Sequence, residues 1–95
     1  LVEDIKDGVA IIKYEYSDDN SLIKEAYFDS NKQLINSAEG YAVRLNTYDK
    51  YNRMIQQKFL SKNEQSIIAK IGYASIEKRY DSNSNIIVEI YRDDK

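Results

Sequence analysis

Apolar and polar residues alternate along short stretches of this chain. The segment "MIQQKFLS" (54–61) places Ile55, Gln57 and Phe59 on one face of an extended strand. The segment before it, "YAVRLNTYD" (41–49), is rich in Tyr, Val and Thr, which suit a pleated, half-buried surface. Because the apolar spacing is nearer two than 3.6, the pattern predicts two strands joined by a few turn residues, and not a helix.

The same hairpin pattern returns at a fixed interval. Gly8, Gly40 and Gly72 lie 32 residues apart, and a shift of 32 aligns four further sets without a gap. These sets are Ala10, Ala42 and Ala74; Tyr16, Tyr48 and Tyr80; Ile23, Ile55 and Ile87; and Tyr27, Phe59 and Tyr91. We therefore divide the chain into the tail of a preceding repeat (1–7), repeat 1 (8–39), repeat 2 (40–71) and a truncated repeat 3 (72–95), together one repeat domain.

The predicted fold is all-β, with tandem 32-residue hairpins in an elongated antiparallel array. The connectors 30–40 and 62–72 leave two alternatives open. Asn31 or Asn63 can cap a short helix that ends near Gly40 or Gly72, and Ile67, Ile68 and Ile71 have helical spacing. An extended stretch with a turn fits the first connector equally well.

Composition limits the chemistry that the chain offers. Hydrophobic residues make up 42% and charged residues 32% of the 95 residues, which is typical of a globular protein. The net charge of −2, with no basic run, argues against a nucleic-acid partner. His and Cys are absent, which removes the commonest general base and the thiolate metal ligands. We expect no enzymatic activity, no cofactor and no metal. No apolar stretch approaches the roughly 18 residues of a membrane span, so we expect no membrane insertion.

The segment "DSNSN" (81–85) has the alternating oxygen spacing that opens an EF-hand calcium loop. Ile86 and Arg92 occupy the places where such a loop needs Gly and a bidentate Glu. The equivalent segments 17–21 and 49–53 do not keep the ligand pattern. We therefore interpret the segment as a hairpin turn in which Asp81 accepts hydrogen bonds from its own backbone.

Paired carboxylates are the second candidate site. Glu25 and Glu89 occupy equivalent places, each flanked by Ile and Tyr, which makes them candidates for a general acid/base pair. The middle unit has Gln57 there, which does not ionise. We therefore expect these residues to be ordinary hydrogen-bond partners of neighbouring Tyr hydroxyls.

Tyrosine accounts for nine residues, and its ring combines apolar area with a polar end. We expect the rows Tyr16, Tyr48, Tyr80 and Tyr27, Phe59, Tyr91 to form the packing between repeats. Tyr41 and Tyr73 begin their strands, and Val9 replaces them in the first unit. We take Tyr41 and Tyr73 as the candidate surface aromatics for binding a partner.

The segments "GYAVRLNTYDKYNRMIQQKFLSKN" and "GYASIEKRYDSNSNIIVEIYRDD" resemble tandem GYA…YDxxGN…YxD hairpin repeats of large bacterial surface or secreted proteins, loosely similar to YD repeats of the Rhs type. The turn glycine of that pattern falls at Asn20, Asn52 and Ser84. Asn tolerates a left-handed backbone, whereas Ser84 is a poorer fit and leaves a shifted turn open. The second glycine falls at Lys32 and Glu64, which leaves the form of that turn open.

The resemblance implies a noncatalytic spacer or interaction module, outside the cell or on its surface, and supplies no catalytic residues. A protein or glycan partner and neighbouring repeats of the same chain are the expected contacts. A carbohydrate- or cell-wall-binding module attached to an enzyme is the alternative. Because the chain opens on Leu1 and not on Met, we expect it to be part of a longer protein.

Overall fold

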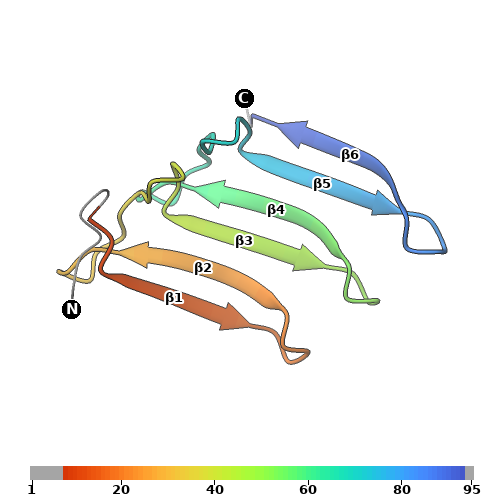
Figure 1. Cartoon of the computed structure of the whole chain (residues 1–95), viewed down its shortest axis with the longest axis horizontal. Coiled ribbons are helices and arrows are strands. Elements are labelled where there is room, and N and C mark those ends of the chain that lie inside the picture. The colour runs from red at the N-terminus through yellow and green to blue at the C-terminus, as the bar shows by residue number, and fades with distance from the viewer. Residues whose placement is uncertain (1–7, 94–95) are drawn as a thin grey trace.

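The computed structural model describes residues 8–93, which form one open sheet of six antiparallel strands and contain no helix (Figure 1). The strands are β1 (Ile11–Tyr16), β2 (Leu22–Phe28), β3 (Val43–Tyr48), β4 (Met54–Leu60), β5 (Ser75–Tyr80) and β6 (Ile86–Arg92). Each strand pairs with the next along the chain, so the predicted all-β antiparallel fold is confirmed. The proposed tail of a preceding repeat, 1–7, lies outside the described residues.

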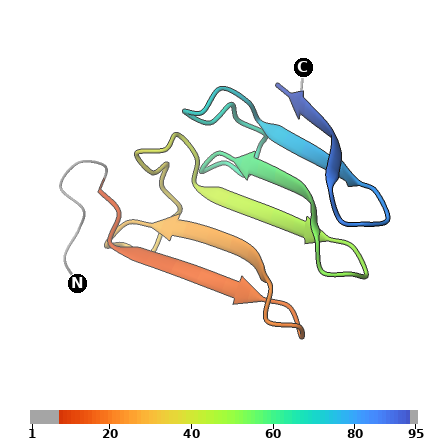
Figure 2. The same ribbon diagram turned by 45° about the vertical axis from the view of Figure 1, so that its right-hand side comes forward.

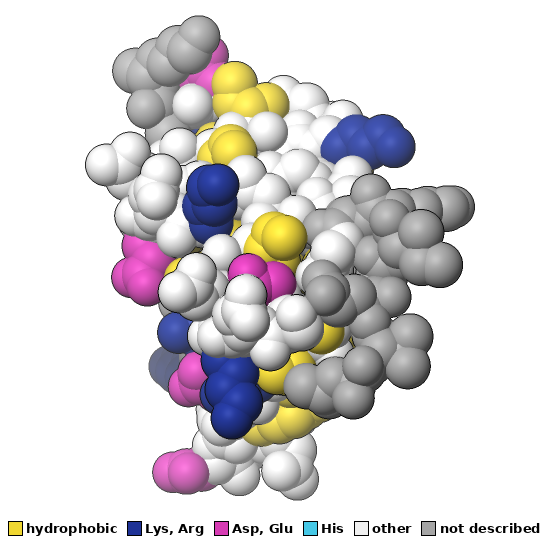
Figure 3. Space-filling view, turned by 90° about the vertical axis from the view of Figure 1, so that its left-hand side faces the viewer, with side chains coloured by type: hydrophobic (Ala, Val, Ile, Leu, Met, Phe, Trp, Pro, Cys, Tyr) yellow, Lys and Arg dark blue, Asp and Glu magenta, His cyan; other side chains and the backbone are white. Residues whose placement is uncertain are grey.

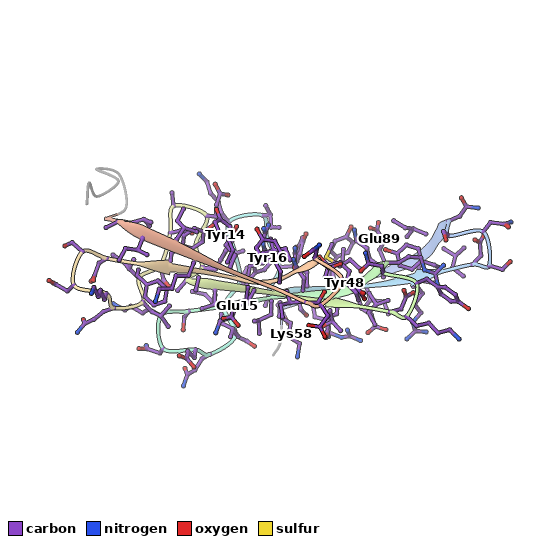
Figure 4. All side chains as sticks on the ribbon, turned by 90° about the horizontal axis from the view of Figure 1, so that it is seen from below. Tyr14, Glu15, Tyr16, Tyr48, Lys58 and Glu89 are labelled. Atoms are coloured by element: carbon purple, nitrogen blue, oxygen red, sulfur yellow. The ribbon has the colours of Figure 1, made fainter. Side chains whose placement is uncertain are left out.

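All three hairpin turns lie at one end of the strands, and both connectors lie at the other (Figures 1 and 2). Side chains alternate between two faces of the sheet. We call the face with Tyr27, Phe59 and Tyr91 the front face, and the opposite one the back face. Figure 4 shows Tyr14 and Glu89 of the front face on the side opposite to Glu15 and Lys58 of the back face.

Each hairpin contains the same irregularity. The strand register shifts just before the Tyr that ends β1, β3 and β5, so these residues pair with Leu22, Met54 and Ile86. The turns that follow have a left-handed residue at equivalent places: φ is 63° at Asn20, 63° at Asn52 and 65° at Ser84. The turn at Ser84 is therefore not shifted, although Ser fits this backbone less well than Asn.

The connectors are turns and extended segments, and the alternative of short helices is not seen in either. Asn31 and Asn63 cap no helix: their backbone N–H groups donate to Asp29 Oδ1 at 2.8 Å and to Ser61 Oγ at 3.2 Å. Gly40, with φ 90°, lies in a turn that its N–H closes by donating to the Ser37 carbonyl at 3.0 Å. The backbone polar groups of these segments thus find partners without helix formation.

Lys32 and Glu64 adopt left-handed backbones, with φ of 65° and 61°. This conformation costs a non-glycine residue about 1–2 kcal/mol. Replacement by glycine removes that strain but costs about 0.5–1 kcal/mol, because glycine loses more conformational entropy on folding. We expect Lys32→Gly and Glu64→Gly each to raise the free energy of unfolding by about 0.5 kcal/mol. Urea unfolding monitored by circular dichroism measures the gain. The control is Asn31→Gly, because Asn31 is an exposed neighbour without positive φ. This variant should give no gain in stability. Equal effects at positions 31 and 32 would show that the left-handed backbone is not the cause of the gain.

The sheet is thin, with extents of 46 × 32 × 19 Å, and has a small apolar cluster on each face. On the back face Ala26, Ala42 and Val43 are buried, and Leu45 and Leu60 pack against them. On the front face Tyr41, Phe59 and Ala69 are buried. Both clusters centre on β2 to β4, while β6 leaves large apolar side chains exposed, namely Ile86, Ile87, Val88 and Tyr91.

Candidate functional site: the aromatic row

Five aromatic rings cross the front face from β2 to β6. We call this set, Tyr27, Tyr41, Phe59, Tyr73 and Tyr91, the aromatic row. Consecutive ring centroids lie 5.7, 4.7, 6.0 and 4.9 Å apart. These are contact distances at which tilted and edge-on rings attract one another. The row joins all three hairpins through side chains, in addition to the backbone ladder.

The two candidate binding residues occupy different positions in this row. Tyr41 is only 6% exposed, so the expectation that it is a surface aromatic is wrong. Its ring lies between those of Tyr27 and Phe59, and Ala69 of the following connector belongs to the same buried cluster. Tyr73 is half-buried beside Phe59 and Tyr91. The ring of the row that offers most surface is Tyr91, which is 55% exposed although it packs against Tyr73 at 4.9 Å, as expected for its row.

The other tyrosine row also acts between hairpins. The Tyr48 hydroxyl donates to the Leu22 carbonyl at 2.9 Å, and the Tyr80 hydroxyl donates to the Met54 carbonyl at 2.6 Å. In both cases the acceptor belongs to the preceding hairpin. Packing between hairpins was the expected role, and it is confirmed for these two residues. Tyr16, the first member of the row, is 58% exposed.

The paired glutamates lie among tyrosine hydroxyls, as expected. The Tyr27 hydroxyl donates to Glu25 at 2.5 Å, and the Tyr91 hydroxyl donates to Glu89 at 3.3 Å. Glu25 is buried and also accepts a hydrogen bond from Arg44 at 3.3 Å. Burial, reinforced by the hydrogen bond to Glu25, raises the pKa of Tyr27 well above its usual value. Partial desolvation together with Glu89 raises the pKa of Tyr91. Both hydroxyls are therefore kept protonated as donors.

A shallow hollow of about 290 Å³ lies beside the buried part of the aromatic row. Its walls combine the aromatic residues Tyr41 and Phe59 with the polar residues Glu39, Arg44 and Gln57. The Arg44 Nε is buried and has no hydrogen-bond partner, the one such side-chain atom among residues 8–93. The hollow is therefore lined by aromatic side chains, a carboxylate and other hydrogen-bonding groups, which suit a small polar molecule.

The turn interpretation of "DSNSN" is confirmed. Asp81 Oδ1 accepts the backbone N–H groups of Asn83 and Asn85, both at 2.9 Å. Asp49 makes the same pair of bonds in the second hairpin, to Tyr51 at 2.9 Å and Arg53 at 3.0 Å. These donors lower the pKa of both carboxyls, because they stabilise the ionised form. Across 8–93 no three acidic residues are grouped in a way that could hold a metal ion.

Among the described residues that Figure 3 shows at the end of the molecule with the connectors, basic and acidic side chains are interspersed. Ion pairs on the described surface join β1 to β2 through Glu15 and Lys24, and β5 to β6 through Glu77 and Arg92. Two arginines donate to Glu77, and these hydrogen bonds lower its pKa. In the described part of the chain, no helix is long and apolar enough to cross a membrane.

Comparisons with protein-family models, with curated proteins and with solved structures give no match. The fold class and the aromatic row thus describe this chain: an open, six-stranded antiparallel sheet whose hairpins are joined by aromatic contacts.

Proposed function

We propose that the chain is a noncatalytic structural and interaction module, built from tandem 32-residue hairpin units, within a larger bacterial surface or secreted protein. One observation carries the proposal: contacts between hairpins recur at the repeat interval. The Tyr48 hydroxyl donates to the Leu22 carbonyl and, 32 residues further along, the Tyr80 hydroxyl donates to the Met54 carbonyl. Recurrence of this kind is the basis of repeat arrays, in which each unit is stabilised by its neighbours.

The aromatic row supports the same role. It uses large side chains to join one hairpin to the next, and it places Glu25 and Glu89 as acceptors for Tyr hydroxyls. Side chains so engaged stiffen a thin sheet that has little interior. The module would hold other domains apart, or present its sheet to a partner protein.

Insertion of one extra unit tests this proposal. A second copy of residues 40–71 placed directly after Ile71 should continue the sheet by two strands. Since neighbouring strands lie about 4.8 Å apart, the sheet should widen by about 10 Å in small-angle scattering. The unfolding midpoint in urea should rise, because an inner unit adds contacts with both neighbours. The control is the same insert with its residues scrambled.

A folded, wider sheet supports the repeat proposal. If the inserted unit is digested by protease as quickly as the scrambled insert, the 32-residue segment is not a structural unit, and the proposal fails.

A carbohydrate- or cell-wall-binding role is the second candidate, favoured by the hollow of about 290 Å³ with its mixed aromatic and polar walls and by the half-buried Tyr73. Tyr41→Ala is a poor test because Tyr41 is buried. Tyr73→Ala removes the ring beside Phe59, which lines the hollow, and should weaken binding on a glycan array, while Tyr51→Ala, in an exposed turn, should leave it intact. An array that gives no signal with the unaltered chain would exclude this candidate for the glycans displayed.

A further inference from the structure

A second hollow, of about 330 Å³, lies on the back face where β2 pairs with β3, and it extends to both connectors. Two charged residues, Lys24 and Glu64, line it together with six apolar residues, which are Ala26, Phe28, Leu34, Val43, Leu45 and Leu60. On the basis of the interaction role inferred for this chain, we propose that a partner protein inserts one large apolar side chain into this hollow. The inserted side chain would belong to a segment that carries a carboxylate beside it.

The equivalent positions 32 residues later show that strand pairing does not need these apolar side chains. Five of the six have a polar or charged counterpart there, namely Lys58 for Ala26, Ser66 for Leu34, Ser75 for Val43, Glu77 for Leu45 and Arg92 for Leu60. β4 and β5 nevertheless pair in the same register as β2 and β3. The apolar patch is therefore specific to the pairing of β2 with β3. A concentration of partly exposed apolar side chains that the fold does not require is typical of an interaction site.

The size and openness of this hollow suit a side chain of a partner. Ala26 and Val43 are buried, whereas Leu34, Leu45 and Leu60 are half-buried and keep apolar surface accessible. Small-molecule pockets begin at about 300 Å³ and cover most of their ligand. This hollow has that lower size and lies on the open face of a single sheet. A single large anchor residue seated in such a depression often supplies much of the binding energy at a protein interface.

Lysine residues flank the mid-strand end of the hollow. Leu45 pairs with Lys24 on one side and with Lys58 on the other, so both lysines lie beside it on the back face (Figure 4). Glu15 forms an ion pair with Lys24 at 3.7 Å, and Glu77, on the same face of β5, is paired with two arginines. Lys58 is exposed and forms no ion pair within residues 8–93. Its ammonium group is therefore available to a carboxylate of the partner.

The connector end of the hollow has the opposite charge. Glu64 is exposed there and has no ion pair among the described residues. On the β1 side, Lys13 adds a further ammonium group, whose Nζ lies 5.1 Å from the centre of the Phe28 ring. An acidic residue of the partner is thus favoured beside Lys58 and disfavoured beside Glu64, which orients the bound segment along the strands.

Selection from a displayed library of random heptapeptides tests the proposal. Peptides that bind the unaltered chain, after counter-selection on Leu45→Glu, should be enriched in Leu, Ile, Met or Phe next to Asp or Glu. Leu45→Glu introduces the residue type of position 77, so the substituted strand pairing already has a precedent in this chain. A synthetic peptide of the enriched sequence should bind the unaltered chain at least tenfold more tightly than this variant in fluorescence anisotropy.

Lys58→Gln supplies a second variant, which should fold normally because Lys58 is exposed. It should weaken peptide binding about fivefold, the upper range for an exposed ion pair. The affinity of the unaltered chain should also fall as the salt concentration rises. The control is Lys50→Gln, which removes the same charge from an exposed residue of a hairpin turn and should leave the affinity unchanged.

The proposal is overturned if no sequence is enriched, if the enriched apolar residues lie next to Lys or Arg, or if the peptide binds Leu45→Glu as tightly as the unaltered chain. Octanoate tests a small anionic amphiphile as the occupant. Equal competition by octanoate at the peptide's concentration would make the hollow a small-molecule site and overturn the partner segment. Self-association that Leu45→Glu abolishes would assign the hollow to a second copy, with the same consequence. Insertion of a second copy of residues 40–71 leaves this hollow unaltered, so its result separates failure of the docking contact from failure of the repeat array.

Discussion

Phe59→Ala should lower the free energy of unfolding by about 3–5 kcal/mol, the loss typical of a buried aromatic residue. Phe59 is 3% exposed, and its ring lies 4.7 Å from that of Tyr41 and 6.0 Å from that of Tyr73. Truncation would leave a void at the centre of the aromatic row, where a sheet one layer thick has little material to fill it. A domain of this length has a total stability of about 5–14 kcal/mol, so a large part would be lost. Urea unfolding monitored by circular dichroism measures the change.

Tyr91→Ala is the matched control for this prediction. Tyr91 occupies the equivalent place in β6 but is 55% exposed and lies at the end of the row. Its removal uncovers less apolar area, and we expect a loss of about 1 kcal/mol. Equal losses for the two variants would show that the row is not the stabilising core of the front face.

Strand positions could be predicted from the sequence because they depend on local pattern. The alternation of Ile55, Gln57 and Phe59 fixes their shared face, and β4 contains all three. The left-handed backbone could likewise be predicted at Asn20 and Asn52, because Asn tolerates this conformation. Ser84 has the same conformation with a less suitable residue, so the surrounding hairpin overrides its preference.

The connectors could not be predicted in the same way, because their partners lie on other segments. Ile67 and Ile71 have helical spacing, yet the Ile67 N–H donates to the Phe59 carbonyl at 3.2 Å. Pairing with the end of a strand thus outweighs a weak local helix preference. The Lys70 N–H donates to the Glu39 carbonyl at 2.8 Å and so ties one connector to the other.

The burial of Tyr41 depends on that connector path. Its ring is covered in part by Ala69, a residue 28 positions further along the chain, and no local pattern reports such a contact. Position at the start of a strand indicated an exposed ring, whereas the fold of the second connector buries it. The exposure of Tyr16 and Tyr91 was not predicted, because the equivalent residues of their rows pack inside the sheet. Tyr16 and Tyr91 themselves lie on β1 and β6, the outer strands of the described sheet.

Arg44→Ile should lower the free energy of unfolding by about 2–3 kcal/mol, and adding Glu25→Gln should restore most of it. Glu25 is 8% exposed and forms an ion pair with Arg44 at 3.3 Å. Removing the arginine leaves a buried carboxylate with the Tyr27 hydroxyl as its remaining side-chain donor. An unpaired buried charge costs about 3–5 kcal/mol, and we lower this value because the Arg44 side chain is 28% exposed.

The residue pair that the double substitution would create already occurs where β4 pairs with β5. Residues 25 and 44 correspond to Gln57 and Ile76, which face each other across β4 and β5 with no charge on either. The variant E25Q/R44I should therefore regain stability to within about 1 kcal/mol of the unaltered chain, because a neutral amide needs no counter-ion.

A double-mutant cycle in urea gives the coupling energy between the two positions. The exposed pair Glu15 and Lys24, 3.7 Å apart, is the control, and its coupling should stay below about 0.5 kcal/mol. Coupling at Glu25 and Arg44 no larger than in the control would mean that water screens the buried pair. In that case the ion pair would not stabilise the pairing of β2 with β3. The stabilisation would come from the backbone hydrogen bonds, the aromatic row and the Tyr48 hydroxyl.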